Sequence, residues 1–404
     1  MNETAVPDTI IVGAGAAGLT TALALAQAGR KVALVGQPDL SPTARTVALF
    51  DGSLKLLANL GVIERLRPDF AALETMRIVD DTGSLFRTPP VEFRASEISL
   101  DVFGENIENR LLVSHLLDAA RAEPRISLID AKVSSAQVHA SSADVTLEDG
   151  RTLSAKLLIA AEGRKSILRK AAGIATRDWS YPQVALTALL THDQPHREVS
   201  TEFHTRQGPF TLVPLPARNG TPHRSSLVWM MDPTEARRRQ ALDDDKLAAE
   251  MTRQSHHLLG KLKLEGPRGA FPMSGLVADK FAQNRVALVG DSAHGFPPIG
   301  AQGLNLGMRD IAHLIDCLEM AEDPGAPDAL TRYDAARRSD ISSRVAGVDM
   351  LNRSLLSAFL PVDFMRGAGL LTLSAIRPLK RMVMREGVMP RGSVPRLMQA
   401  QNSL

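Results

Sequence analysis

The sequence has few cysteines and few aromatic residues. Cys317 is the single cysteine among 404 residues, so no internal disulfide and no cysteine-rich metal site can form, and metal binding is not expected. One thiol is compatible with a reducing cytoplasm. The aromatic residues are 12 Phe, 2 Trp and 2 Tyr, too few for a protein that binds nucleic acid by stacking. With so few aromatic residues, a ligand pocket would be lined by aliphatic and methionine side chains.

The chain also lacks an excess of charge of one sign. Lys plus Arg number 47 and Asp plus Glu number 45, so the net charge of +2 provides no field that would attract a nucleic acid. Residues 341–404 nevertheless carry a net charge of +6, and the remainder carries −4. This tail includes an apolar run over 367–376 that precedes several cations, a combination that suits an anionic membrane surface. A helical cap with solvated cations is the alternative interpretation.

An uncharged segment covers residues 9–29 and is long enough to span a bilayer on count alone. Its leader contains Glu3 and Asp8 instead of the basic residues of a signal peptide. The pattern favours a strand over 9–13, a glycine turn and a helix over 19–29, followed by a strand over 31–35. This order is the first βαβ unit of a doubly wound α/β fold.

Further along the chain, residues 47–60 and 108–122 have helical patterns, and short strands are expected between 126 and 160. Strand-like segments separated by Pro, Gly and Asn occupy most of 179–272, which indicates an inserted, mostly antiparallel domain. A long helical pattern begins at Gly303.

The turn after the first strand has the sequence Gly13-Ala-Gly15-Ala16-Ala17-Gly18. In this context the first glycine permits a tight turn, the second lets the backbone approach a pyrophosphate, and the third allows close helix packing. The helix N-terminus would supply free N–H groups to the phosphates. The acidic residue usual at the end of the second strand is absent, because Gly36 and Gln37 occupy its place. Gln37 can still hydrogen-bond a ribose.

Two more motifs follow buried strands. The second, Ala160-Ala-Glu162-Gly163-Arg-Lys-Ser, ends a strand over 156–160. The third runs from Val289-Gly-Asp291-Ser-Ala-His294 through a glycine-rich loop to Gly307. Asp291 at a strand end can hydrogen-bond a polyol chain. The loop can direct the N–H groups of the following helix toward an electron-rich carbonyl.

These three motifs, in this order and spacing, resemble those of the class A flavoprotein aromatic hydroxylases. The third motif, which extends to Asp310, is similar to that of the ubiquinone-biosynthesis hydroxylases of the UbiH/UbiF/VisC family. The resemblance covers nearly the whole chain. Three positions depart from the family pattern: Glu162 replaces Asp, Gly300-Ala301 replaces Ala-Gly, and Pro297 replaces a second histidine.

The resemblance implies a Rossmann-like FAD-binding domain with an inserted substrate domain. Its discontinuous FAD-binding domain would comprise 1–75, 95–178 and 273–345, the substrate domain 76–94 and 179–272, and a C-terminal helical region 346–404. No catalytic base can be selected, and His294 is the nearest candidate. The residues that the resemblance and the motifs place at the cofactor are Gly13, Gly15, Ala16, Ala17, Gly18, Gln37, Arg45, Arg110, Glu162, Gly163, Asp291, Pro298, Gly300, Gln302, Gly303, Leu304 and Asn305.

The implied activity is hydroxylation of an aromatic ring with O2 as the oxygen source. FAD would be the cofactor, and NADPH or NADH would provide electrons directly or through a reductase. The substrate would be a polyprenylated phenol or benzoquinol of ubiquinone biosynthesis. Other proteins of that pathway and the membrane surface would be partners, and the enzyme would be cytoplasmic, peripheral to the inner face of the membrane. Two alternatives remain open: a flavin monooxygenase of a soluble secondary metabolite, and a non-catalytic FAD-binding scaffold.

Overall fold

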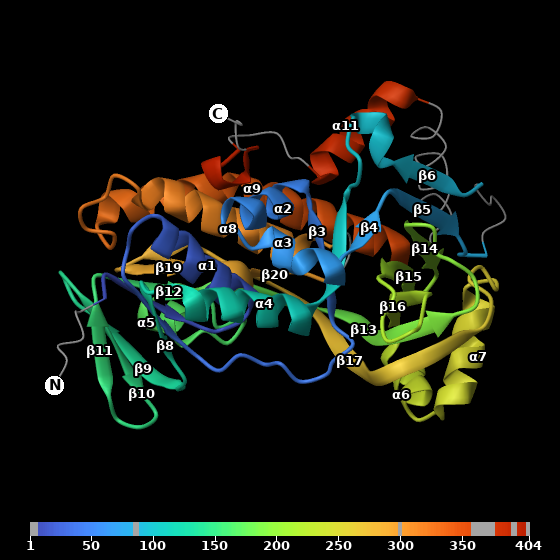
Figure 1. Cartoon of the computed structure of the whole chain (residues 1–404), viewed down its shortest axis with the longest axis horizontal. Coiled ribbons are helices and arrows are strands. Elements are labelled where there is room, and N and C mark those ends of the chain that lie inside the picture. Colours follow the sequence, from blue (N-terminus) through green and yellow to red (C-terminus); the bar gives the residue numbers. More distant parts are fainter. Residues whose placement is uncertain (1–6, 84–88, 298–300, 357–375, 389–393, 401–404) are drawn as a thin grey trace.

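The larger part of the chain is built on a six-stranded sheet. The computed structural model describes residues 7–83, 89–297, 301–356, 376–388 and 394–400, with the backbone alone over 342–356 (Figure 1). The strand order is β18-β19-β12-β1-β2-β8, and every pairing except β18–β19 is parallel. The strands are β1 (Thr9–Val12), β2 (Val32–Val35), β8 (Ile126–Ile129), β12 (Leu157–Ala160), β18 (Ala282–Gln283) and β19 (Val286–Leu288). All residues of β1, β2, β12 and β19 are buried, as expected for strands that are covered on both faces.

Helices and a small sheet cover the two faces. Helices α1 (Ala16–Gln27), α4 (Asn109–Ala122) and α8 (Gln302–Leu318) pack together on one face, and α9 (Pro327–Leu356) packs against α8 (Figure 1). The other face carries α5 (Ile167–Ala171) and a three-stranded antiparallel sheet. The strands of that sheet are β9 (Val133–Val138), β10 (Ala143–Leu147) and β11 (Thr152–Ala155). This arrangement confirms the predicted doubly wound α/β architecture.

A second small sheet lies beside the domain just described, with the order β3-β7-β4. It consists of β3 (Thr46–Phe50), β7 (Gly104–Glu108) and β4 (Ala71–Leu73). The helical prediction for 47–60 is therefore wrong at its start: residues 46–50 pair with β7, and only α2 (Asp51–Asn59) is helical. Strand β3 forms because it pairs with β7, which is distant in the sequence, and a local hydrophobic pattern cannot show such a partner. After α2 come α3 (Ile63–Leu66) and the 3-10 turn η1 (Arg67–Asp69).

The inserted region forms an eight-stranded, mostly antiparallel sheet of order β20-β17-β13-β16-β15-β14-β5-β6. Helices α6 (Pro233–Gln240) and α7 (Asp244–Gln254) cover one face of it, above a core that includes Phe203, Phe210 and Trp229. Asp232 caps α6 by accepting a hydrogen bond from the Thr234 N–H at 2.7 Å. The strands are β5 (Thr75–Asp80), β6 (Val91–Arg94), β13 (Thr176–His192), β14 (Val199–Thr205), β15 (Gly208–Leu215), β16 (Arg224–Met231), β17 (Leu262–Ala278) and β20 (His294–Gly295).

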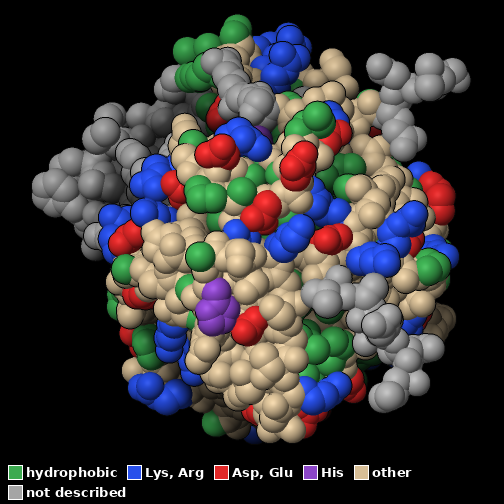
Figure 2. All heavy atoms as spheres, turned by 90° about the vertical axis from the view of Figure 1, so that its left-hand side faces the viewer, with side chains coloured by type: hydrophobic (Ala, Val, Ile, Leu, Met, Phe, Trp, Pro, Cys, Tyr) green, Lys and Arg blue, Asp and Glu red, His purple; other side chains and the backbone are tan. Residues whose placement is uncertain are grey.

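The described C-terminal elements pack on both parts of the molecule. Helix α11 (Arg377–Val388) buries Met384 against the 3-10 turn η2 (Ala95–Ile98). The turn η4 (Arg396–Met398) returns to α2, where the Asn59 side-chain amide donates to the Leu397 carbonyl at 2.8 Å. Among the described residues, no helix has both the length and the apolar character that a bilayer crossing requires. One face of the molecule, around the β9–β11 sheet, carries interspersed cations and anions (Figure 2).

Candidate active site

The three sequence motifs meet at one edge of the parallel sheet. They follow β1, β12 and β19, which are neighbours and parallel, so their carboxyl ends lie together. Backbone hydrogen bonds extend the ladder beyond the strands: the Ala161 N–H donates to Val12 at 2.8 Å, and the Val289 N–H donates to Ala160 at 3.0 Å. In open α/β sheets, ligands bind at this carboxyl edge.

The first glycine turn has two crowded positions and one open position. Gly13 has a φ of 113°, and a Cβ there would lie 2.3 Å from the Ala161 carbonyl oxygen. A Cβ on Gly18 would lie 1.8 Å from the Gly13 oxygen, so α1 packs directly on the turn. A Cβ on Gly15 would meet no atom within 4 Å. The turn therefore leaves free space in front of α1, where a phosphate group fits.

Helix α1 begins at this open space with uncapped N–H groups. Its N-cap, Gly15, has no side chain to accept a hydrogen bond from the first turn. Ala16 is buried and Ala17 is half-buried. A Cβ on Gly290 would lie 3.4 Å from the Ala17 Cβ, which places the third motif directly beside the first. The N–H groups and the partial positive charge of α1 are suited to a pyrophosphate.

The end of β2 lacks a carboxylate for a ribose, as the sequence indicates. A Cβ on Gly36 would lie 2.7 Å from the Ala14 nitrogen, so this glycine permits close contact with the first turn. Gln37 is exposed. Asp39 accepts a hydrogen bond from the Ser41 N–H at 3.0 Å, and hydrogen bonds from Ser41 lower the pKa of Asp39. Arg45 is exposed just before β3.

Arg110 lies on the first turn of α4 and is held by Glu108, with 3.1 Å between Nη2 and Oε2. Glu108 is 2% exposed and also binds Arg224 at 2.9 Å and Arg218 at 3.3 Å. Burial favours the neutral acid, but these guanidinium groups outweigh it and lower the pKa of Glu108. The ion pair fixes Arg110 in place, with a third of its side chain still exposed.

Glu162 in the second motif has local hydrogen-bond partners. Its Oε1 accepts hydrogen bonds from Ser166 Oγ at 2.6 Å and from the Leu168 N–H at 2.8 Å, so it caps α5. The N–H of the adjacent Gly163 donates to Ser292 Oγ at 3.0 Å, which joins the second motif to the third. Sequence reasoning placed Glu162 at the cofactor and missed this capping role. The serine four residues later, just before a helix, was the available signal.

The third motif begins with the 3-10 turn η3 (Gly290–Ser292). Asp291 is exposed, and no described residue forms a hydrogen bond or an ion pair with its carboxylate. Asp310 of α8 holds the motif on both sides of Asp291. It accepts hydrogen bonds from the Gly290 N–H at 2.9 Å and from His294 Nε2 at 2.6 Å. The site therefore presents a free carboxylate on a fixed loop.

His294 and Asp310 are both fully buried. The second carboxylate oxygen of Asp310 binds Arg337 at 2.7 Å. Burial raises the pKa of Asp310, but the charges of His294 and Arg337 outweigh it and lower the pKa overall. The other ring nitrogen of His294, Nδ1, has no hydrogen-bond partner among the residues that the structure describes. Asp310 ends the third motif, but the sequence prediction does not include it among the site residues. The available signal was a carboxylate at a helical position after a glycine-rich loop.

Helix α8 begins at the edge of the site. Its N-cap, Ala301, has a left-handed backbone with a φ of 52°, where the family pattern places glycine. Gln302, Gly303 and Leu304 form the first turn, and a Cβ on Gly303 would meet no atom within 4 Å. Pro298 and Gly300, also predicted to lie at the cofactor, fall outside the described residues.

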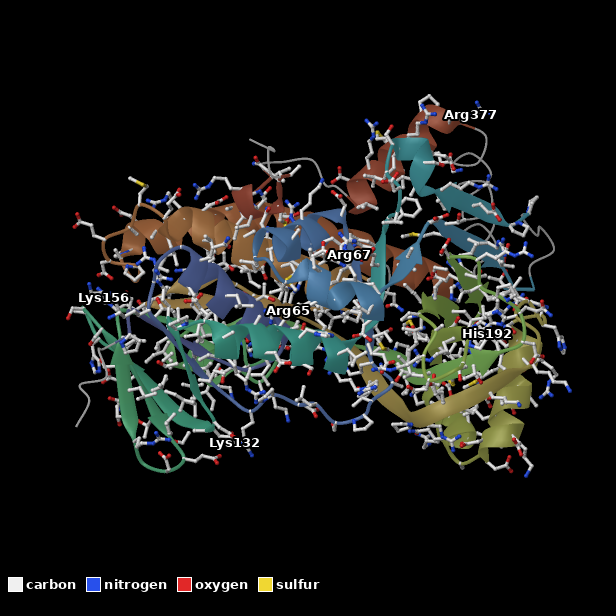
Figure 3. The ribbon with its side chains drawn as sticks, viewed as in Figure 1. Arg65, Arg67, Lys132, Lys156, His192 and Arg377 are labelled. Carbon is white, nitrogen blue, oxygen red and sulfur yellow. The ribbon has the colours of Figure 1, made fainter. Side chains whose placement is uncertain are left out.

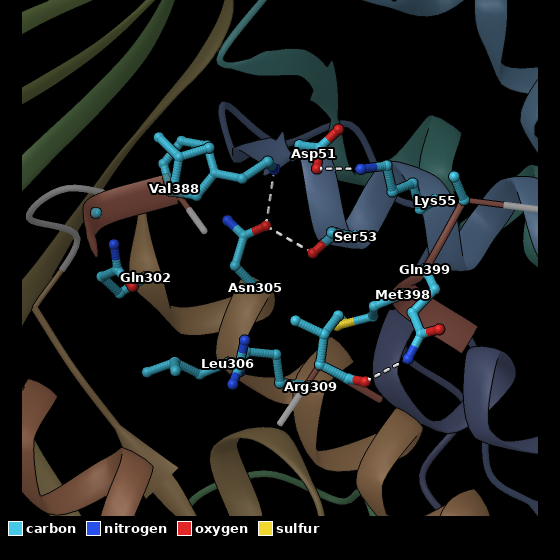
Figure 4. A pocket seen from close by; sticks show the side chains of 15 residues that line it. Asp51, Ser53, Lys55, Gln302, Asn305, Leu306, Arg309, Val388, Met398 and Gln399 are labelled. Carbon is cyan, nitrogen blue, oxygen red and sulfur yellow. Dashed lines mark hydrogen bonds and ion pairs between the residues drawn. The ribbon is translucent and has the colours of Figure 1, made fainter. Parts of the chain in front are cut away.

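Asn305 connects α8 with the small sheet. Its side-chain oxygen accepts hydrogen bonds from the Phe50 N–H at 2.9 Å and from Ser53 Oγ at 2.7 Å (Figure 4). Its amide donates to the Ala48 carbonyl at 2.8 Å. Gln302 and Asn305 line a cavity of about 460 Å³ between α2, α8 and η4. Among the described residues, no group of His, Cys, Asp and Glu side chains is arranged for a metal ion.

The residues at this edge fit a dinucleotide such as FAD. The open space at Gly15 and the uncapped α1 would receive the pyrophosphate, and the unpaired Asp291 would accept hydrogen bonds from a ribityl chain. The fold and the site define a dinucleotide-binding α/β protein with an inserted β-sheet domain. Comparison with known proteins specifies its family.

The chain belongs to the FAD-binding monooxygenase family: the family model described as "FAD binding domain" matches residues 7–346. Ubiquinone hydroxylase UbiL of Rhodospirillum rubrum is 33% identical, over 98% of this chain and 93% of that protein. The 3-demethoxyubiquinol 3-hydroxylase of Escherichia coli is 30% identical, over 93% of this chain and 96% of that protein. The predicted class A flavoprotein relationship is thereby confirmed, and the protein is a flavin-dependent enzyme.

Solved structures show the same fold. The p-nitrophenol 4-monooxygenase PnpA of Pseudomonas putida DLL-E4 has a TM-score of 0.78 at 18% identity, with 96% of this chain and 99% of that chain covered. HpxO of Klebsiella pneumoniae, solved with FAD and uric acid, has a TM-score of 0.75 at 21% identity, with 95% and 96% covered. At these identities the likeness establishes the architecture alone.

Proposed function

We propose that the protein hydroxylates the aromatic ring of a polyprenylated phenol or benzoquinol in ubiquinone biosynthesis. The observation that carries this proposal is the 33% identity with a ubiquinone hydroxylase over nearly the full length of both chains. The scarcity of aromatic residues also fits an aliphatic pocket for a prenyl tail.

In this proposal the three motifs hold FAD. The turn around Gly15 and the N-terminus of α1 bind the pyrophosphate, with Arg45 and Arg110 on the phosphate and adenosine side. Asp291 binds the ribityl chain, and the loop before α8, with Gln302, lies along the flavin ring. The other residues that the sequence predicts at the cofactor are proposed to contact FAD as well. Bound FAD supplies the redox chemistry, in which electrons from NADH or NADPH activate O2.

The chain's own residues position this chemistry. Asp310 and His294 fix the loop that carries Asp291, and Asn305 fixes the start of α8 against β3. His294 makes this contact from a fully buried position. Its role in the proposal is therefore to orient the loop.

The test combines cofactor content and product mass. Purified protein should contain FAD and should add one 18O atom to the ring of 2-geranylphenol under 18O2 with NADH or NADPH, supplied with a reductase if neither donor alone reduces the flavin. Protein that binds FAD but never consumes O2 with any ring substrate would support the scaffold alternative. Activity on soluble phenols alone would favour a secondary-metabolite monooxygenase.

We also propose that the enzyme works peripherally at the inner face of the membrane, in contact with its lipid-soluble substrate and other proteins of the pathway. Helix α11 supports this location, because Arg377, Arg381 and Arg385 are exposed together with Met382 and Val383. Figure 3 shows Arg377 at the outer end of this helix, away from the parallel sheet. Such a helix suits an anionic lipid surface.

The full-length protein should float with phosphatidylglycerol vesicles and much less with phosphatidylcholine vesicles. A variant with Met382→Ser and Val383→Ser should lose most of this binding and keep its FAD. Equal flotation of both proteins would contradict a role for α11.

A further inference from the structure

The inner face of the eight-stranded sheet, opposite α6 and α7, carries a row of side chains that no motif includes. Residues paired directly across neighbouring strands point to the same face of a sheet. The register places Thr187 opposite Val228, Val228 opposite Thr211, Thr211 opposite Glu202, and Glu202 opposite Ile78. None of the five belongs to the core cluster beneath α6 and α7. All except Thr187 are partly exposed.

This inner face reaches β3, the strand that directly follows Arg45. Ser226 lies two residues before Val228, and therefore on the same face, and Thr46 of β3 donates a hydrogen bond to Ser226 Oγ at 2.9 Å. From strand geometry, Glu202 lies about 7 Å along the strands and about 10 Å across them from Ser226. In the proposed complex, one substrate with a substituted aromatic ring would extend from the neighbourhood of Ser226 to Glu202.

Glu202 is held in a defined position. Its Oε1 lies 2.7 Å from His204 Nε2, and Thr211 donates a hydrogen bond to its other oxygen at 3.3 Å. The Glu202 side chain is 23% exposed. Burial favours its neutral form, but the hydrogen bond and charge of His204 outweigh this effect and lower the pKa of Glu202. At neutral pH the group is a carboxylate that only accepts hydrogen bonds.

The same face contains two buried polar atoms that have no partner among the described residues. Nδ1 of His204 and Oγ1 of Thr187 are both buried and form no hydrogen bond within the part of the chain that the structure describes. Unpaired buried polar atoms are costly, and they often mark places where a ligand or an ordered water belongs. Their neighbours in the next row, Ala185 and Met230, are buried and apolar. The face therefore combines partly exposed apolar side chains, those of Val228 and Ile78, with a polar end, which suits a phenol with a prenyl tail.

We infer that Glu202, ordered by His204 and Thr211, accepts a hydrogen bond from the ring hydroxyl of the substrate. This inference rests on the proposed function and adds the recognition of the hydroxyl group. A hydrogen bond to an ionised carboxylate also draws the hydroxyl proton away from the ring oxygen, which makes the ring more electron-rich and a better acceptor of oxygen. The aliphatic side chains of the inner face would contact the apolar part of the molecule.

The test compares 2-geranylphenol with its methyl ether, which cannot donate a hydrogen bond. Each probe is titrated into the FAD-loaded protein, and binding is followed by the change in flavin absorbance. The native protein should bind the phenol about tenfold or more tightly than the ether, and Glu202→Gln should reduce this preference to about threefold or less. The same variant should lower the rate of phenol hydroxylation at saturation.

Glu105→Gln is the matched control, because Glu105 is a half-buried carboxylate on β7 outside this face, and it should keep the native preference. His204→Leu should weaken the preference while the FAD content stays unchanged. If the native protein hydroxylates 2-geranylphenol and Glu202→Gln retains the full preference, the inference is wrong and the proposed function stands. If the native protein neither binds nor oxygenates the phenol, the proposed function fails and the inference fails with it.

Discussion

Gly13 and Gly15 are two residues apart in the first turn, but the structure gives them different constraints. A side chain at Gly13 would collide with the backbone of Ala161, whereas a side chain at Gly15 would enter open space. The first glycine is therefore needed for the fold, and the second leaves open the space where the pyrophosphate is proposed to bind. Substitution of each glycine by alanine can separate these two roles.

Gly13→Ala should lower the free energy of unfolding of the FAD-free protein by about 2–4 kcal/mol, because it forces a clash at a positive φ. Gly15→Ala should change that stability by about 1 kcal/mol or less and reduce FAD affinity at least tenfold. Urea denaturation of the FAD-free protein and FAD titration provide the two measurements. Retention of native FAD affinity by Gly15→Ala would rule out the pyrophosphate placement.

The sequence predicts the roles of single glycines better than the contacts of single carboxylates. The spacing of the glycines in a motif follows from local backbone constraints, so these constraints can be inferred from the sequence. The hydrogen bonds of Glu162 to Ser166 and Leu168, and the ion pair of Asp310 with Arg337, depend on where side chains turn after folding. The Glu202–His204 pair shares a face of the sheet with Thr187 and Thr211 only because of strand register, which a single sequence does not specify.

At the scale of elements, α6 and α7 are joined by a cluster of ion pairs. Glu250 of α7 binds Arg238 at 2.7 Å and Arg239 at 3.0 Å, and Arg239 stacks on Trp229 at 4.0 Å from the ring centroid. The hydrogen bonds of Arg238 and Arg239, despite opposing desolvation, lower the pKa of Glu250 from 4.5 to about 2. The cluster holds both helices on the outer face of the substrate sheet.

A carboxylate with a lowered pKa stabilises the fold above the unfolded value and loses this contribution as the pH falls. Glu250→Gln should therefore lower the free energy of unfolding by about 1–2 kcal/mol at pH 7. The difference from the native protein should shrink as the pH falls from about 4.5 toward 2. Urea denaturation across this range measures it, with the exposed Glu148→Gln as the control; a pH-independent difference would exclude the ion pairs as its cause.

Helices and strands are predicted well where the local hydrophobic pattern determines them, and poorly where pairing with a distant strand determines them. Strands β1 and β2 lie within one residue of the predicted 9–13 and 31–35, whereas α1 begins three residues before the predicted 19–29. Antiparallel strands fill much of the predicted 179–272, although β13 begins earlier, at Thr176, and β17 continues to Ala278. Residues 46–50 do not, because β3 exists through its pairing with β7. The cap at Asp232 was predictable, since proline and an acidic residue follow it within one turn.

At the scale of the whole molecule, buried ion pairs connect the small β3-β7-β4 sheet with the eight-stranded substrate sheet. Glu108 of β7 is buried against Arg224 of β16, and Arg224 also binds Glu265 of β17 at 2.7 Å. Because Arg224 is 1% exposed, removal of one partner would leave a buried charge without full compensation. The sequence shows neither the pairing nor its position between the two parts.

Glu108→Gln should lower the free energy of unfolding by about 2–4 kcal/mol, and adding Arg224→Met should recover part of that loss. Chemical denaturation of the two single variants and the double variant measures the coupling. Additive effects would mean that the pair does not connect the two parts energetically.

Gly36 limits which side chains the end of β2 can carry. Any side chain at this position would press its Cβ to within 2.7 Å of a backbone nitrogen, and backbone cannot move aside as a flexible side chain can. An acidic side chain at Gly36 would therefore require that the end of β2 first adopt another path. Engineering of a carboxylate for a ribose is sterically open at the exposed Gln37, whereas at Gly36 it would have to begin with the backbone near Ala14.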